Sequence, residues 1–336
     1  MGHDDPLVGA ARQGDEAAFE RLVARYRPEL AAHCYRMLGS IQDAEDAVQE
    51  ALLGAWRGLP GFDARSSFRT WLYAVTTNAC LRAASRRPRR VLSFDRRPAW
   101  TDTADLGGWV GEPVWLEPRP DDPVADDGSD PESAYLRRES VELAYVAALQ
   151  HLPGAQRAVL ILRDALGFSA AETAEILGTT PASVNSAMQR ARTTVAERIP
   201  TRSQHDELTS LGPEGCRGVL EAFVTAWERS DVAALLELMA EDARFTMPPL
   251  PAWFDGREAV GRFMAERMFA APWRLLPLRA NGQPGFACYQ HDGHGYALGA
   301  INVLSFRSGR VAWIAAFLDP EVHRRFGIPE IFPSDR

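Results

Sequence analysis

The stretch GTTPASVNSAMQRAR, residues 178–192, opens with a glycine that suits a tight turn. Thr180 and Pro181 then suit the cap and first position of a helix. Apolar residues recur at steps of four and three, which predicts a buried face made of Val184, Met188, Ala191 and Val195. The opposite face carries short polar groups, then a long amide and a guanidinium: Ser183, Ser186, Gln189 and Arg190. Such a face can approach base edges and phosphates in a DNA major groove, although many buried helix pairs share the pattern.

The residues before this stretch predict another helix, which comes first in the chain and packs against the helix that begins at Pro181. Ser169 and Glu172 have the spacing of a capping box. Ala174, Gly178 and Val184 have the spacing of a helix-turn-helix, in which a small residue allows close approach and an apolar residue locks the second helix.

Composition restricts the class of protein. The chain has 336 residues, enough for two or three domains, and 46% of them are hydrophobic. No apolar run reaches the roughly 20 residues of a membrane span, and the acidic start MGHDDPLVGA does not resemble a signal peptide. The four cysteines are far apart, so we expect reduced thiols, no metal or cofactor, and a cytoplasmic location.

The net charge of −8 is unevenly distributed. Residues 99–133 hold ten acidic residues and one arginine, whereas residues 1–98 and 134–202 are mildly basic. Because DNA affinity depends on local potential, the overall charge does not exclude a nucleic-acid partner. The acidic stretch is also rich in proline and glycine, and we expect it to be a linker.

Residues 43–59, DAEDAVQEALLGAWRGL, predict an amphipathic helix with an acidic outer surface that includes Asp43, Asp46, Gln49 and Glu50. That surface is either solvated or a docking face for a basic partner. Residues 62–90 then alternate aromatic and arginine side chains. Such side chains suit unpaired bases beside phosphates, but the aromatics can equally form a core.

In this order the parts resemble extracytoplasmic-function sigma factors of the sigma-70 family. Residues 43–81 resemble region 2, and residues 136–199 resemble region 4. The resemblance implies that Asp43, Asp46, Gln49 and Glu50 contact the β′ clamp helices of core RNA polymerase. It implies that the melted −10 element is contacted by Phe68, Arg69, Trp71, Asn78, Arg86 and Arg87. It implies contact with the −35 element for Ser183, Ser186, Gln189 and Arg190, and with the polymerase β flap for region 4. Arg82 departs from the family, which usually has an acid there, so the local −10 preference stays open.

The C-terminal part changes from helical to mixed periodicity, with strand-like stretches separated by NG, DG and SG turns. Residues 214–330 resemble the SnoaL-like branch of the nuclear-transport-factor-2 fold. The expected architecture is two all-α sigma domains, a region 2 bundle and a region 4 helix-turn-helix, followed by an α+β cone of curved mixed sheet wrapped by helices. The expected segments are region 2 at 1–95, a linker at 96–133, region 4 at 134–202, a short linker at 203–213, and the SnoaL-like domain at 214–336.

Cones of this fold often enclose an apolar pocket. Candidate lining residues are Trp227, Met247, Trp253, Tyr289, Asn302 and Phe317, which ordinary core packing would also explain. The fold also occurs in isomerases and cyclases, but Asp255 and Asp319 look like turn residues, so we expect no enzyme.

The resemblance implies a promoter-specific sigma factor whose tail modulates it in cis, with no separate anti-sigma factor, no membrane partner and room for a small ligand. We further expect the acidic linker to thread the basic interior of polymerase. The alternatives are a DNA-binding protein fused to a SnoaL-like enzyme, or a ligand-sensing DNA-binding regulator.

Overall fold

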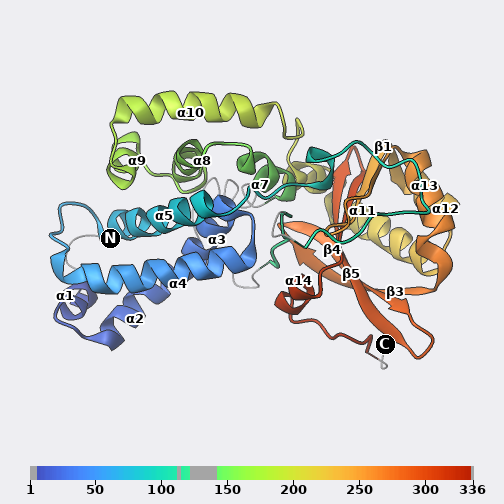
Figure 1. Cartoon of the computed structure of the whole chain (residues 1–336), viewed down its shortest axis with the longest axis horizontal. Helices are drawn as coiled ribbons and strands as arrows, with labels where there is room; N and C mark the ends of the chain where they lie inside the picture. Colours follow the sequence, from blue (N-terminus) through green and yellow to red (C-terminus); the bar gives the residue numbers. More distant parts are fainter. Residues whose placement is uncertain (1–5, 112–114, 122–141, 334–336) are drawn as a thin grey trace. The chain divides into compact units, whose positions relative to one another are not determined.

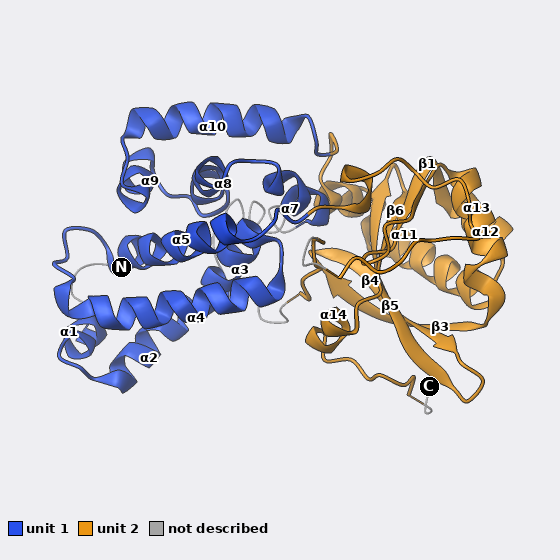
Figure 2. Cartoon of the chain, viewed as in Figure 1, with its two compact units in different colours: residues 1–90, 128–199 blue, residues 91–127, 200–336 orange. Residues whose placement is uncertain are grey.

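The computed structural model describes residues 6–111, 115–121 and 142–333. The chain divides into two compact units (Figure 2): residues 1–90 and 128–199 form unit 1, and residues 91–127 and 200–336 form unit 2. The described part of the expected linker therefore belongs to the unit that holds the C-terminal domain. The rest of that linker, 122–133, and the first residues of expected region 4, 134–141, lie outside the described residues.

The first part of unit 1 is a helical bundle. Its elements are α1 (Pro6–Arg12), α2 (Glu16–Ala24), α3 (Arg27–Leu38), α4 (Ile41–Gly58), η1 (Leu59–Gly61) and α5 (Phe68–Arg86). Serine side chains cap the two longest helices: Ser40 accepts from the Asp43 amide, and Ser67 accepts from the Thr70 amide. The apolar stripe expected in residues 43–59 is buried at Ala44, Val48, Ala51, Leu52 and Ala55.

The second part of unit 1 contains the predicted helix-turn-helix. Its elements are α7 (Leu143–Gln150), α8 (Gly154–Leu160), the π-helical turn η3 (Ile161–Ala165), α9 (Ala170–Leu177) and α10 (Pro181–Ala196). The capping box between Ser169 and Glu172 is present, and Gly178 ends α9 with a φ of 61°. Thr180 caps α10, whose inner face buries the four apolar residues expected there. Figure 1 shows α10 lying across α8 and α9.

Unit 2 is built on one six-stranded mixed sheet in the order β2-β1-β6-β5-β4-β3. The strands are β1 (Met239–Thr246), β2 (Trp253–Asp255), β3 (Trp273–Ala280), β4 (Gln283–His291), β5 (Tyr296–Arg307) and β6 (Arg310–Phe317). Only the β1–β6 pair among them is parallel. The NG and SG turns close the β3–β4 and β5–β6 hairpins, with positive φ at Asn281, Gly282, Ser308 and Gly309. Tight hairpins favour such residues because their turns require left-handed backbone.

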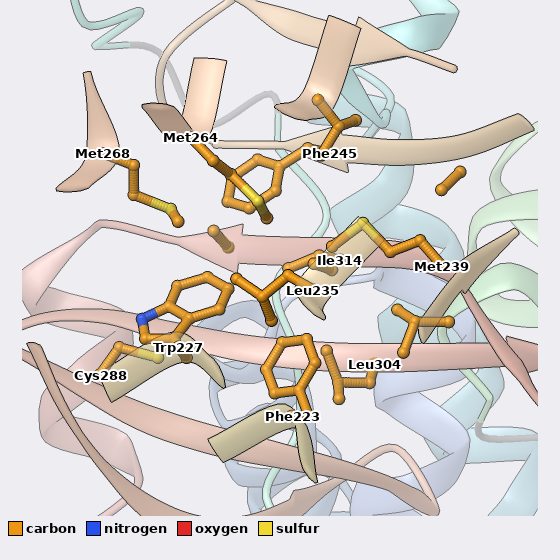
Figure 3. Packing of buried hydrophobic residues seen from close by; sticks show 14 of the residues in the cluster. Phe223, Trp227, Leu235, Met239, Phe245, Met264, Met268, Cys288, Leu304 and Ile314 are labelled. Atoms are coloured by element: carbon orange, nitrogen blue, oxygen red, sulfur yellow. The ribbon is translucent and has the colours of Figure 1, made fainter. Parts of the chain in front are cut away.

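Helices pack against this sheet. They are α11 (Gln204–Glu228), α12 (Val232–Leu238) and α13 (Arg257–Glu266), with the short η4 (Met268–Ala270). Side chains from α11 and the sheet, among them Phe223 and Leu304, meet in the core (Figure 3). The rings of Phe223 and Phe286 stack there at 5.7 Å. The remaining elements are η2 (Ser93–Asp95) and α14 (Pro320–Arg325).

Residues 203–213, expected as a short linker, form the first turns of α11, and the kink falls at Gly212 before Pro213. Two buried side chains anchor this segment to the β5–β6 hairpin. Gln204 donates to the Phe306 carbonyl at 2.9 Å and accepts from the Phe306 amide at 2.6 Å. Glu207 accepts from the Ser308 amide at 2.8 Å. The polar side chains of this segment therefore pair with backbone groups at the end of β5 and in the turn that follows it.

Candidate functional site

The outer face of α10 presents the four residues expected to read the −35 element. Ser183, Ser186, Gln189 and Arg190 are all exposed. Arg192 lies on a neighbouring face, where it is bound to Asp164 at 2.6 Å. Arg190 is therefore not part of the ion pair that holds Arg192. The helix face that carries Arg190 has side chains of the kind that read base edges in a major groove.

The residues expected to face melted DNA divide into two groups. Phe68 is only 8% exposed and packs with Phe62 and Trp71, at centroid distances of 6.1 and 5.6 Å. Phe68 is therefore buried in the core, which is one of the two roles that the sequence left open for these aromatic residues. Trp71 is half-buried, whereas Asn78 and Arg86 are exposed on α5. Arg87, which follows α5, is also exposed, but its guanidinium pairs with Asp43.

Arg69 is held by the helix-turn-helix part of unit 1. Its guanidinium lies over the Phe168 ring at 4.2 Å from the centroid, and it donates to the Leu166 carbonyl at 3.3 Å. The Tyr73 ring also meets the Phe168 ring, at 5.0 Å. The middle of α5 is therefore covered by the segment between η3 and α9.

A buried arginine ties the two parts of unit 1 together, and sequence reasoning missed it. Arg157 donates to the carbonyls of Gln150 and Leu152, to the Gln150 side chain, and to the Met37 carbonyl on α3. Gln150 also donates to the Arg36 carbonyl at 3.1 Å. Burial lowers the pKa of Arg157 to about 10, so it remains charged at neutral pH. The one available signal was an arginine inside the apolar run that follows Pro153.

The acidic residues of α4 mostly contact arginines of this chain. Asp43 is 4% exposed and bound to Arg90 at 2.6 Å and to Arg87. Glu50 is bound to Arg82 at 2.8 Å. Asp43 was expected to contact a partner, and in this structure its carboxylate is instead buried in an internal ion pair. Arg82, which departs from the family pattern, is the partner of Glu50.

Another face of α4 forms a groove with α2, with a volume of about 810 Å³. Its apolar walls include Phe19, Val48, Leu52 and Trp56, and Leu53 beside them is 52% exposed. Its polar lining is mostly acidic and consists of Glu16, Glu20, Glu45, Gln49 and one basic residue, Arg27. An apolar groove with acidic edges suits an amphipathic basic helix. Of the four residues expected to dock a partner, only Gln49 lines this groove.

Unit 2 contains a cavity of about 310 Å³ between the sheet and its helices. Trp227, Met247 and Asn302 line it as expected. The other three expected residues do not line it. The Trp253 indole donates to the Arg97 carbonyl, and the Tyr289 hydroxyl donates to the Pro329 carbonyl. Successive residues of a strand point to opposite faces of the sheet. Cys288 and Ala316 line the cavity, so Tyr289 and Phe317, which follow them directly, point to the other face.

The described part of the linker binds the C-terminal domain at two places. Near its start, the Trp100 amide donates to the Trp253 carbonyl at 2.7 Å, and the Val110 amide donates to the Pro249 carbonyl at 3.1 Å. Near its end, Arg119 and Asn281 exchange two hydrogen bonds, of 2.8 and 2.9 Å. The Trp100 contact lies at β2, one edge strand of the sheet, and the contacts near Pro120 lie at the end of β3, the other edge strand. Both edges would otherwise offer unpaired backbone groups.

Asp121, the last described residue of this linker segment, accepts from the Gly282 amide at 2.8 Å and pairs with Arg279 at 3.3 Å. This acid is therefore engaged by the protein's own sheet in the described structure. The acids Asp122, Asp126 and Asp127 lie outside the described residues.

A two-part helical unit with a helix-turn-helix, joined to an α+β cone, defines a promoter-recognition protein with a fused SnoaL-like domain. Comparison with known families agrees. The chain matches sigma-70 region 2 over residues 22–90, sigma-70 region 4 over residues 142–195, and the SnoaL-like domain over residues 220–314.

Individual relatives match this chain over more than half of its length, and some match nearly all of it. It is 41% identical to the ECF RNA polymerase sigma factor SigG of Mycobacterium tuberculosis, across 97% of this chain and 90% of the relative. It is 30% identical to the ECF RNA polymerase sigma-E factor of Escherichia coli K12, across 58% of this chain and 94% of the relative. The crystal structure of Mycobacterium tuberculosis extracytoplasmic function sigma factor SigJ shares the fold, with a TM-score of 0.60 and 23% identity, across 91% of this chain and 98% of that one.

The protein belongs to the ECF RNA polymerase sigma factors of the sigma-70 family. It binds core RNA polymerase and promoter DNA, and it directs promoter-specific transcription initiation. Within the described ranges, no helix combines the length and the apolar character that a membrane crossing requires.

Proposed function

We propose that this sigma factor is controlled in cis, because its C-terminal domain holds the linker that joins regions 2 and 4. The observation that carries the proposal is the pair of linker contacts, at Trp100–Val110 and at Arg119–Asp121. A linker that is bound at both places cannot extend freely, so it limits how far the two DNA-reading regions separate.

The packing inside unit 1 supports the same proposal. The −10 and −35 elements are centred about 25 base pairs apart, which is about 85 Å along B-DNA at 3.4 Å per pair. Regions 2 and 4 instead share a buried interface around Arg69 and Arg157. Reading both elements therefore requires that this interface open, and a linker held by the C-terminal domain opposes that opening.

In the open state, Arg69, Trp71, Asn78 and Arg86 contact the melted −10 strand, and the outer face of α10 contacts the −35 element. The groove between α2 and α4 receives a helix of the polymerase clamp. The apolar floor and acidic edges of the groove support this assignment. Asp46, Gln49 and Glu50 lie on the exposed side of α4, where a partner can reach them. Region 4 contacts the polymerase β flap.

The C-terminal domain regulates and does not catalyse. The acids that a SnoaL-like enzyme could use as a base are engaged elsewhere: Asp255 pairs with Arg244 at 3.2 Å, and Asp319 caps α14. Neither acid lines the described cavity. Control by this domain removes the need for a separate anti-sigma factor.

Two adjacent glycines of the linker provide a matched test. Gly107 has a φ of 77°, and a Cβ there would lie 2.7 Å from the Pro251 ring. Gly108 has open space around it. Gly107→Ala should therefore loosen the linker, while Gly108→Ala should not. Amide hydrogen exchange over residues 97–111 reports the loosening directly, since the Trp100 and Val110 amides lie in that peptide.

Run-off transcription with purified core polymerase then tests the function. We expect the full-length Gly107→Ala protein to produce several-fold more transcript than the wild type, and Gly108→Ala to match the wild type. Faster exchange in Gly107→Ala together with unchanged transcription would overturn control by the linker contacts. Loss of transcription without loss of polymerase binding would instead show that the docked linker is needed for activity.

A further inference from the structure

A pocket of unit 1 lies where the region 2 and region 4 parts meet, and its lining is strongly basic. It has a volume of about 340 Å³. The end of α5 and the segment after it line the pocket from region 2, and the turn between α7 and α8 lines it from region 4. Its arginines are Arg87, Arg89, Arg90 and Arg157, whereas the one acid among the described lining residues is Asp43. The lining therefore carries an excess of three positive charges.

The single acid of the pocket is already engaged by two of these arginines. Asp43 accepts from Arg90 at 2.6 Å and also pairs with Arg87. Within the described residues, neither Arg89 nor Arg157 forms an ion pair. Two positive charges at the pocket are therefore left without a carboxylate.

One of these two charges is buried. Arg157 is 7% exposed, and the groups that accept from it are all neutral: the Gln150 side chain and the carbonyls of Met37, Gln150 and Leu152. Burial, and after it the charge of Arg89, lower the pKa of Arg157 to about 10, so Arg89 lies close enough to repel it. A buried charge without a counter-ion is unfavourable, and a second charge of the same sign adds to the cost.

The other charge is accessible to a ligand. Arg89 is exposed, and no described residue forms a hydrogen bond or an ion pair with its side chain. Its planar guanidinium matches the spacing of phosphate oxygens, to which it can donate two parallel hydrogen bonds. Apolar side chains, among them Leu38, Leu81 and Leu152, form the other walls and strengthen electrostatic attraction by excluding water. A pocket of this volume admits a small molecule but not a DNA duplex.

We propose that this pocket binds a small phosphate-bearing molecule, which accepts hydrogen bonds from Arg89 and neutralises the buried charge of Arg157. Arg89 belongs to region 2 and Arg157 to region 4, so a bound anion replaces their repulsion by attraction to both. Binding therefore stabilises the packing of the two regions. This effect on packing regulates the protein only under the proposed function, in which the packed regions are the restrained state, whereas the site itself does not depend on that proposal.

Inorganic pyrophosphate is the probe, titrated calorimetrically into the full-length protein in magnesium-free buffer. The variants are Arg89→Gln and, as the matched control, Arg57→Gln, and each removes one exposed positive charge. Arg57 is in the last turn of α4, about 20 Å along that helix from Asp43. We expect Arg89→Gln to weaken pyrophosphate binding about tenfold, the effect of one charge-assisted hydrogen bond, and Arg57→Gln to weaken it less than about twofold.

Two results of this titration would overturn the site. One is equal weakening in the two variants, which would indicate general attraction to a basic protein. The other is the absence of binding to the wild type at about 1 mM pyrophosphate. Both substituted side chains are exposed, so both variants should fold, and thermal unfolding checks this.

A nucleic-acid backbone offers the same phosphate chemistry, and a second measurement separates the two sources. Fluorescence anisotropy gives the affinity of each variant for the single-stranded −10 element. We expect Arg89→Gln and Arg57→Gln to bind this strand equally well. A loss of DNA affinity confined to Arg89→Gln, as large as its loss of pyrophosphate affinity, would assign Arg89 to promoter DNA and overturn the small-molecule site.

Hydrogen exchange over residues 161–173 tests the effect on packing, because this segment holds Leu166 and Phe168, which contact Arg69 of α5. Saturating pyrophosphate should slow exchange there several-fold in the wild type and in Arg57→Gln, but not in Arg89→Gln. Binding without slower exchange would overturn the stabilised packing and leave the site.

Run-off transcription with the same proteins separates this inference from the proposed function. Pyrophosphate also acts on polymerase itself, and that effect is common to all three proteins. We expect additional inhibition in the wild type and in Arg57→Gln compared with Arg89→Gln. Slower exchange without this additional inhibition would contradict the proposed control and leave the site and its effect on packing in place.

Discussion

The guanidinium of Arg69 lies 4.2 Å from the centroid of the Phe168 ring. Arg69 is on α5, the helix expected to meet melted DNA, and Phe168 directly precedes the helix-turn-helix. One cation–π contact thus joins the two regions that the proposed control would separate. The contact occupies an arginine that the proposal assigns to the −10 strand for as long as the regions remain packed.

Replacing the ring should release that arginine. Phe168→Leu keeps an apolar side chain in the buried site but removes the aromatic face, which is worth about 0.5–1 kcal/mol to the guanidinium. We expect the free protein to bind the single-stranded −10 element about two- to fivefold more tightly, measured by fluorescence anisotropy. Arg69→Ala in the same background should abolish the gain. Unchanged affinity in Phe168→Leu would mean that the contact does not restrain Arg69.

The outer face of α10 yields a second prediction. Arg190→Ala should weaken binding to a −35 duplex by about 1–3 kcal/mol if the side chain reads a base edge. Arg192→Gln is the matched control, because Arg192 is held by Asp164 on another face and its loss should change DNA affinity little. Electrophoretic mobility shifts at fixed salt measure both variants. Equal losses in the two variants would indicate a general effect of charge and not a specific contact.

The buried ion pair of Asp43 and Arg90 predicts a stability effect where the family resemblance implied a polymerase contact. Asp43→Ala leaves the Arg90 guanidinium buried without this carboxylate, which costs about 3–5 kcal/mol. Asp46 is exposed, so Asp46→Ala should stay within about 0.5 kcal/mol. The urea concentration at the midpoint of unfolding, followed by loss of the helical circular-dichroism signal, distinguishes the two variants. Similar midpoints for the two variants would show that the ion pair contributes little.

The stability of unit 1 should also depend on pH through His33. Burial, with a smaller contribution from the charge of Arg36, lowers its pKa from 6.5 to about 3. Between these two pKa values, His33 is protonated in the unfolded chain and neutral in the folded chain. The free energy of unfolding therefore falls as the pH drops below 6.5. Between pH 6.5 and 4.5 the loss from this residue is about 2 kcal/mol.

His33→Gln removes the titrating group and should reduce that pH dependence. His33 Nε2 lies 3.0 Å from the Thr77 hydroxyl, a contact that a glutamine amide can also make. Urea unfolding at pH 6.5 and 4.5 gives the comparison, and carboxylates contribute equally to both proteins. The prediction fails if the two proteins lose the same stability over this range.

Local patterns predicted much of the secondary structure. The capping box of Ser169 and Glu172, the cap at Thr180 and the buried face of α10 are all confirmed, because each depends on residues within one or two helical turns. The NG and SG turns were predicted for the same reason. The strand β1 was missed, since its parallel partner β6 is distant in the sequence.

The sequence by itself determined the family, the order of the domains and the residues that face outward on α10, because helical periodicity and turn chemistry act over a few residues. Only the tertiary structure decided which charged and aromatic residues are free. Asp43 meets Arg90 across 47 positions, and Arg119 meets Asn281 across 162. Burial and pairing over such separations depend on how distant elements pack, and periodicity within one segment carries no information about that packing.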